Sequence, residues 1–167
     1  MGVSGSGKTT LGKALAGRRQ CAFRDADDFH SAANVTKMRS GIPLTDDDRM
    51  PWLDRIGAWI ATQAALGDES VLACSALKRC YRDHLRKSGA DVLFVVIDAK
   101  RSLLARRLGG RQGHFMAQAL LDSQIADYER PMPDECAIFV SATDPVDRQV
   151  EAIVATMTLT AAGGAII

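Results

Sequence analysis

Short apolar stretches alternate along the chain with longer segments in which apolar residues recur at helical spacing. Four stretches have the length of strands: 21–24, 70–74, 92–97 and 137–140. The third is a continuous run of largely β-branched residues, as expected of a strand that is covered on both faces. Helical spacing predicts helices over 8–18, 48–66, 79–87, 102–108, 116–127 and 146–157. The alternation predicts an α/β fold, with a parallel sheet and helices on both of its faces.

Composition narrows the class of protein without identifying an activity. The chain has 167 residues, of which 47% are hydrophobic and 25% charged, which is typical of one soluble globular domain. The net charge of +1 provides no field that would attract nucleic acid or an acidic membrane. No apolar run reaches the length of a membrane span, and the first residues lack the pattern of a signal peptide. We expect a cytoplasmic domain over residues 1–160, without nucleic-acid or membrane partners, and an apolar tail over 161–167.

The four cysteines are scattered and form no CxxC pair: Cys21, Cys74, Cys80 and Cys136. This spacing argues against a zinc site and against a disulfide scaffold. It is typical of thiols in a reducing compartment, and Cys74, at the end of a predicted strand, is expected to be packed rather than reactive.

Residues 2–9, GVSGSGKT, match the phosphate-loop pattern G-x-x-x-x-G-K-[ST] at every position. Glycines let successive backbone N–H groups surround a phosphate, and the following helix directs its positive end to the same place. Lys8 would reach the β- and γ-phosphates as a catalytic cation, and the Thr9 hydroxyl would bind Mg²⁺. The alternative is a glycine-rich turn that matches by chance. The residues predicted to bind ATP here are Gly2, Val3, Ser4, Gly5, Ser6, Gly7, Lys8, Thr9 and Thr10.

No strand precedes this loop in the sequence, and Met1 stands where the last residue of such a strand would be. Either the true chain begins upstream or the protein lacks this strand. Without it we expect low stability and weak nucleotide binding, because ordering a flexible loop costs roughly 1–2 kcal/mol per residue. An apolar extension before Met1 should restore both. The tail Ala165-Ile166-Ile167 is not expected to fill the gap, because it is short and follows Gly163 and Gly164.

A pair of carboxylates, Asp25 and Asp27, follows the first predicted strand. Residues two apart project to the same side of an extended chain. One carboxylate, Asp25, can then hold Mg²⁺ while the other, Asp27, accepts the proton of an attacking hydroxyl. The alternative is a solvated acidic turn that caps the next helix.

Four further blocks extend the pattern: DADDFH at 25–30, PLTDDDRMPWL at 43–53, CSALK at 74–78 and RLGGRQGHF at 107–115. With the phosphate loop, they resemble the gluconate kinases over about residues 1–150. The resemblance implies a P-loop NTPase three-layer sandwich of the nucleoside-monophosphate-kinase type, with a small lid over about 107–128. It also implies ATP and Mg²⁺ as cofactors, phosphorylation of D-gluconate to 6-phospho-D-gluconate for the pentose phosphate pathway, and a possible homodimer.

A small polyhydroxylated anion needs cations and hydrogen-bonding groups in its pocket. Several cations could converge above the carboxyl edge of the sheet, where ligands bind in open parallel sheets. A solvated surface cation is the alternative for each, although Lys78 follows a buried strand closely. His114 could contact gluconate or cap the lid helix. The predicted substrate-binding residues are Asp27, His30, Lys37, Arg49, Lys78, Arg82 and His114.

Arg107 and Arg111 occupy the position of the lid and would stack on adenine or neutralise the transferred phosphoryl group. An ordinary basic loop is the alternative. The run 46–48 is expected to cap a helix rather than bind metal, and Trp52 is expected in the core.

Two competing functions stay open. One is a shikimate-type kinase, which the CSALK block disfavours. The other is an N-terminally truncated nucleotide-binding protein with little or no turnover.

Overall fold

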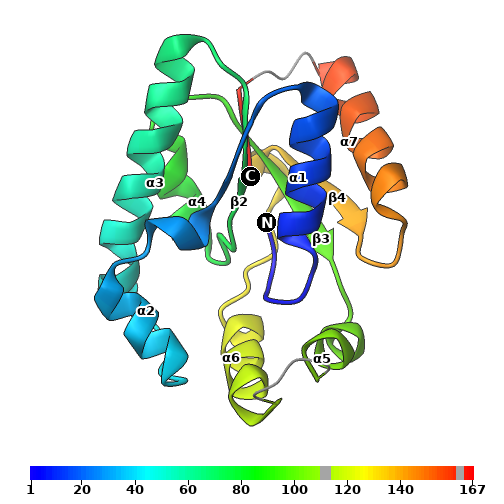
Figure 1. Cartoon of the computed structure of the whole chain (residues 1–167). Coiled ribbons are helices and arrows are strands. Elements are labelled where there is room, and N and C mark those ends of the chain that lie inside the picture. Colours follow the sequence, from blue (N-terminus) through cyan, green and yellow to red (C-terminus); the bar gives the residue numbers. More distant parts are fainter. Residues whose placement is uncertain (110–113, 161–163) are drawn as a thin grey trace.

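The computed structural model describes residues 1–109, 114–160 and 164–167, and its strands form one sheet in the order β1-β2-β5-β3-β4 (Figure 1). The strands are β1 (Ala22–Asp25), β2 (Ser70–Ala73), β3 (Val92–Asp98), β4 (Ala137–Ser141) and β5 (Ala165–Ile166). All pairings between neighbouring strands are parallel. The predicted α/β class is confirmed, as are the four strands that the apolar stretches indicated.

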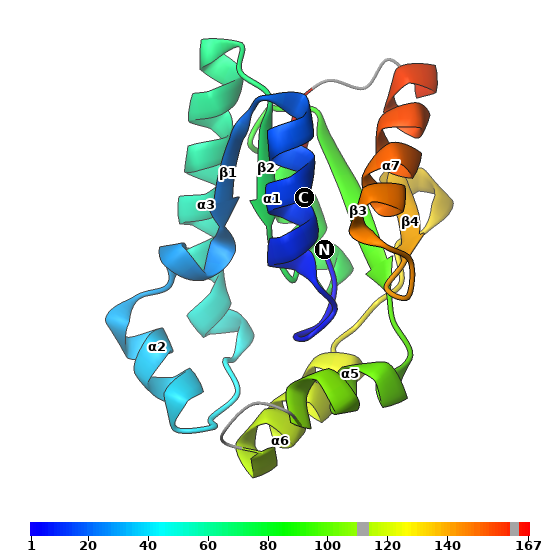
Figure 2. The ribbon, with the colours of Figure 1, turned by 45° about the vertical axis from the view of Figure 1, so that its right-hand side comes forward.

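Helices cover both faces of the sheet. Side chains of α1 (Lys8–Arg19) and α7 (Val146–Thr160) pack on one face, and those of α3 (Asp46–Leu66) and α4 (Arg79–Arg86) on the other. Beyond the carboxyl ends of the strands lie α5 (Arg101–Gly109) and α6 (His114–Ala126), while α2 (Ala32–Arg39) lies beyond the same end on the α3 side (Figure 2). Two 3₁₀ helices, η1 (Ala26–Phe29) and η2 (Pro133–Glu135), complete the described elements. The sequence pattern did not indicate α2, η1, η2 or β5.

The core around the sheet consists of two layers, because side chains alternate along each buried strand. A third apolar cluster joins the phosphate loop to α5 and α6. Val71 and Val95 point to the layer that contains α1 and α7. Their chain neighbours Leu72 and Phe94 point to the layer that contains α3 and α4. Strands that are apolar at every position are therefore required in the middle of this sheet.

The expectation that the apolar tail stays outside the sheet is wrong. Residues 165–166 form β5, which pairs with β2 on one side and with β3 on the other. The side chains of Ala165, Ile166 and Ile167 are at most 4% exposed. The tail was too short to be recognised as a strand from its pattern, but a position between two strands offers partners for its backbone on both sides.

The acidic run begins α3, as predicted. The Thr45 hydroxyl accepts a hydrogen bond from the Asp48 N–H, and the Asp48 carboxylate accepts one from the Thr45 N–H. This reciprocal capping satisfies two backbone donors at the start of the helix. Trp52, one turn further, is 3% exposed, which confirms its place in the core. None of the described helices is both long enough and apolar enough to cross a membrane.

Candidate active site

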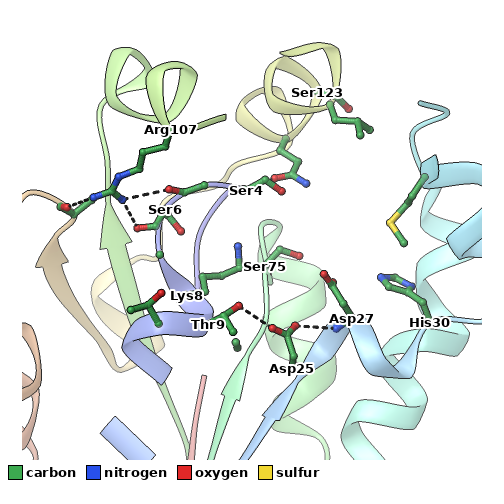
Figure 3. A pocket seen from close by; sticks show the side chains of 18 of the residues that line it. Ser4, Ser6, Lys8, Thr9, Asp25, Asp27, His30, Ser75, Arg107 and Ser123 are labelled. Carbon is green, nitrogen blue, oxygen red and sulfur yellow. Dashed lines mark hydrogen bonds between the residues drawn. The ribbon is translucent and has the colours of Figure 1, made fainter. Parts of the chain in front are cut away.

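A cavity of about 570 Å³ opens at the carboxyl edge of the sheet, above the start of α1 (Figure 3). The phosphate-loop residues Ser4–Thr10 form its floor. Gly7 has φ 109°, a conformation that L side chains rarely adopt, and it leads directly into the first turn of α1. The backbone N–H groups of this turn have no partners within the helix, and together with the helix dipole they form an anion site.

Lys8 lies in the middle of this floor. Its ammonium group donates to the carbonyl of Val3, at 3.1 Å, rather than to a carboxylate. Burial lowers the pKa of Lys8, and the nearby carboxylates Asp25 and Asp27 oppose this effect. The cation is therefore held at the loop by a weak neutral partner, which a phosphate oxygen can replace.

The two carboxylates of the predicted pair lie beside the loop, where β1 ends. The Thr9 hydroxyl donates to Asp25 Oδ2 at 2.8 Å, and the Asp27 N–H donates to Asp25 Oδ1 at 3.2 Å (Figure 3). Asp27 itself faces the open cavity. Partial desolvation raises the pKa of Asp27, and the charge of Asp25 raises it further. A carboxylate with a raised pKa is a better proton acceptor than an ordinary one.

Thr9 and Asp25 together suit a magnesium ion, since hydroxyl and carboxylate oxygens are the ligands that Mg²⁺ prefers. Within the described residues, no group of three or more His, Cys, Asp or Glu side chains could hold a metal ion alone. A Mg²⁺ ion at this place would therefore take its remaining ligands from phosphates and water.

His30 and Trp52 form the wall of the cavity on the α3 side. Their rings stack with centroids 4.6 Å apart and planes 7° apart, and the indole N–H donates to the carbonyl of Ala26. Burial lowers the pKa of His30 to about 4, and the charges of Arg49 and Arg55 add to this effect. His30 is thus a neutral imidazole at pH 7, and its Nδ1 has no partner among the described atoms.

The predicted substrate-binding cations differ in whether they line the cavity. Arg49 lines the cavity, and its guanidinium lies 3.4 Å from an Asp127 carboxylate oxygen. Lys78 lies behind it, 2.8 Å from Asp46 Oδ1, and both cations lie over the Tyr81 ring. Lys78 is not among the residues that line the cavity. Arg49 is therefore the cation of this group that a ligand would meet directly.

Lys37 is likewise paired away from the cavity lining. Its ammonium lies 2.6 Å from Asp48 Oδ1, so it ties the end of α2 to the start of α3. The Asp48 carboxylate has its pKa lowered to about 2 by this partner and by the Thr45 N–H. In this arrangement Lys37 holds α2 and α3 together beside the cavity.

Arg82 has a different place from the one expected. Its side chain is 0% exposed and lies outside the cavity lining. The guanidinium donates to both carboxylate oxygens of Glu135, at 2.6 and 3.0 Å, and to the carbonyls of Ala76 and Leu77. Four of its five N–H donors are used inside the protein and the side chain is fully buried, so Arg82 is removed from the proposed substrate set. Its role here is to fasten η2 to the loop between β2 and α4.

Replacing Arg82 by leucine is expected to lower stability by about 3–5 kcal/mol, because the buried Glu135 carboxylate loses its bidentate partner and keeps only the Met132 N–H and Arg86 at 3.7 Å among the described residues. Thermal unfolding of the two proteins measures this effect. The matched control is Arg79→Leu, which breaks the exposed pair of Arg79 with Asp134 and should cost at most about 1 kcal/mol. An unchanged melting temperature with a raised KM for substrate in Arg82→Leu would restore the substrate-binding role.

Arg107 of α5 reaches the phosphate loop. Its guanidinium donates to the carbonyl of Ser6 at 2.9 Å and to that of Ala142 at 2.8 Å (Figure 3). It therefore joins α5 to the loop and to the segment after β4, at the edge of the cavity. Two other lid predictions, Arg111 and the side chain of His114, lie outside the described part of the chain.

Sequence reasoning missed several residues that line the cavity. Gln124 of α6 accepts a hydrogen bond at its Oε1 from the Ser4 N–H, at 2.7 Å, so one loop donor is already occupied. The available signal was a run of three polar residues, 122–124, between apolar residues of α6. Ser75 belongs to the CSALK block but was not assigned a role, and the segment after β4 gave no comparable signal. The other missed lining residues are Met38, Pro43, Leu44, Ala73, Leu120, Ala142, Asp144, Val146 and Gln149.

Comparisons with known proteins agree with this geometry. A family model described as an AAA domain matches residues 1–131. A gluconokinase of Gluconobacter oxydans is 47% identical over 92% of this chain and 86% of its own length. The thermosensitive gluconokinase of Escherichia coli is 44% identical over 81% of this chain and 72% of its own length.

Solved structures give the same result. A gluconokinase from Sinorhizobium meliloti matches with a TM-score of 0.86 at 41% identity, covering 96% of this chain and 90% of that one. A shikimate kinase from Aquifex aeolicus matches with a TM-score of 0.60 at 17% identity, covering 98% and 97%. The second likeness concerns the fold alone.

Proposed function

Because the chain belongs to the gluconokinase family, we propose that it transfers the γ-phosphoryl group of ATP to the 6-hydroxyl of D-gluconate. One observation carries the proposal: a single cavity holds the phosphate loop with Lys8 in its middle and the carboxylate of Asp27 beside it. Phosphoryl transfer to a hydroxyl needs a phosphate site and a proton acceptor next to each other. The cavity contains both.

The two ends of the cavity differ in chemistry, and this difference supports a separate side for each of the two substrates. On one side of the loop lie Arg107 and Val146, which offer a planar guanidinium, held by the Ser6 and Ala142 carbonyls, and apolar surface for a purine ring. On the other side lie His30 and Arg49, which offer a neutral ring nitrogen and a cation. A sugar acid suits the second side, with its carboxylate towards Arg49 and its hydroxyls towards His30. We assign Lys37 and Lys78 to holding this wall in place through their pairs with Asp48 and Asp46.

Asp27 acts as the proton acceptor in the proposed reaction. The bond between the γ-phosphorus and its bridging oxygen to ADP breaks, and a new bond forms to the 6-oxygen of gluconate. The hydroxyl proton passes to the Asp27 carboxylate, whose raised pKa favours this transfer. Lys8 and the N–H groups at the start of α1 stabilise the charge on the phosphoryl oxygens. Thr9 and Asp25 would hold the Mg²⁺ ion that accompanies ATP and neutralises part of that charge.

A coupled assay of ADP release over a panel of sugar acids tests the proposal. We expect turnover with D-gluconate, and product analysis should find the phosphate on the 6-hydroxyl. Shikimate serves as the control acceptor, since the structural likeness to a shikimate kinase is one of fold. Turnover with shikimate and none with gluconate would reject the substrate assignment, and ATP binding without any turnover would favour a nucleotide-binding protein. A homodimer stays a prediction from the family resemblance. A cytoplasmic location stays a prediction from the composition and the cysteine spacing.

A further inference from the structure

The segment 164–167 lies along the middle of the sheet, between β2 and β3 (Figures 1 and 2). On the β3 side, Ala165 N–H donates to the carbonyl of Asp91 and Ile167 N–H to that of Leu93, both at 2.9 Å. Val95 N–H donates back to the carbonyl of Ile167 at 2.6 Å. On the β2 side, the segment pairs in register with residues 70 and 71.

Met1 continues the same ladder. Its backbone nitrogen donates to the carbonyl of Val95, and Ile97 N–H donates to the carbonyl of Met1 at 3.1 Å. In a parallel ladder, every second residue of a strand forms hydrogen bonds with the same neighbouring strand. Ile167 bonds to Leu93 and Val95 of β3, and Met1 bonds to Val95 and Ile97. Ile167 and Met1 therefore occupy ladder positions two apart along one strand line. Gly2 N–H then donates to the carbonyl of Ser75, and the phosphate loop begins. Two segments from opposite ends of the sequence thus lie on the strand line that leads into the loop.

Side chains of this segment belong to both layers of the core. Ile166 packs in the layer with α1 and α7, while Ala165 and Ile167 pack in the layer with α3 and α4, together with Met1. Each is almost fully buried. The segment therefore contributes apolar surface directly below the phosphate loop and to the layer that contains α1.

We propose that the segment Gly164–Ile167 positions the phosphate loop, so that nucleotide affinity depends on it. Without the segment, backbone groups of β2 and β3 would lose their hydrogen-bond partners in the centre of the sheet. Met1 would lose the residues that lie before it on the same strand line. The N–H groups of the loop would then have to be ordered by the nucleotide itself, at the expense of affinity. This inference rests on the proposed function only as far as ATP binding.

Gly164→Ala probes the segment with a single methyl group. Gly164 has φ +125°, and a Cβ there would stand 2.3 Å from the carbonyl oxygen of Asp91, so β5 must move away from β3. Gly89→Ala is the matched control, since Gly89 also has a positive φ of +82° but nothing within 4 Å of the added carbon. We expect Gly164→Ala to weaken ATP binding about tenfold, which corresponds to the free-energy cost of ordering about one additional residue. In Gly89→Ala we expect little change in ATP affinity. ATP is titrated calorimetrically, without gluconate, at a temperature at which circular dichroism finds both variants folded.

A second pair of variants guards against a weak effect of the methyl group. Ile166→Asp places a charge in the buried segment, and Leu66→Asp makes the same change at a position that is 67% exposed. If Ile166→Asp does not fold, a rearranged chain decides the question: residues 164–167 and one linking residue are placed before Met1, and the chain ends at residue 160. The ladder positions predict that this chain folds and binds ATP as the original does, whereas the same chain with aspartate for Ile166 does not.

The inference is overturned if Gly164→Ala and Ile166→Asp bind ATP as tightly as their controls, or if the rearranged chain folds without binding ATP. A parent chain that binds ATP but does not phosphorylate gluconate would contradict the proposed function alone. The two failures are therefore distinguishable.

Discussion

Replacing Lys8 by alanine is expected to lower kcat for gluconate phosphorylation by at least about 10²–10³-fold, the usual effect of removing one charge-stabilising donor at a reacting centre. Lys8 lies in the middle of the phosphate loop, and among the described residues its ammonium group donates only to the carbonyl of Val3. Its ammonium group is therefore available to the phosphoryl oxygens, where negative charge shifts during transfer. Steady-state kinetics with saturating ATP and gluconate measures the effect on kcat.

Lys13→Ala is the matched control, because it makes the same change on the same helix. Lys13 is exposed, and its ammonium lies 5.9 Å from the centre of the Phe23 ring, away from the cavity lining. We expect its kcat to stay close to that of the parent chain. Similar losses in both variants would mean that the effect of Lys8 is general electrostatics or stability rather than contact with the phosphates.

Replacing Asp27 by asparagine is expected to lower kcat by about 10²–10⁴-fold, the range for loss of a general base, and to leave ATP affinity nearly unchanged. Asparagine has the same shape but cannot accept the hydroxyl proton. Asp27 faces the cavity, and its raised pKa suits proton transfer. Kinetics of turnover and a separate ATP titration distinguish the loss of a base from the loss of a nucleotide contact.

Asp28→Asn is the control for this change, since Asp28 is the next residue, is exposed and does not line the cavity. It should retain near-normal kcat. A near-normal kcat in Asp27→Asn as well would show that the base assignment is wrong. A parallel loss of ATP affinity would instead place Asp27 in the nucleotide site.

Features that are encoded in a few consecutive residues could be predicted without the structure. The phosphate loop is a run of consecutive residues, so its glycines, Lys8 and Thr9 could be recognised without knowledge of any other segment. Asp25 and Asp27 could be placed at the mouth of the site because they follow a strand, and strands of a parallel sheet end at a common edge. The start of α3 was predictable for the same reason, since Thr45 and Asp48 cap the helix from within four residues.

Roles that depend on partners far away in the sequence became apparent from the folded arrangement. Arg82 is a cation in a promising block, but Glu135, 53 residues away in sequence, makes it a buried structural group. Gln124 reaches the Ser4 N–H across 120 residues of sequence, and no local pattern reports that contact. The tail gives the clearest case: Ile166 belongs to a stretch too short to be recognised as a strand, yet it lies in the centre of the sheet. A strand that short is stabilised mainly by the hydrogen bonds and apolar surface of its neighbours, and these exist only once the rest of the chain has folded.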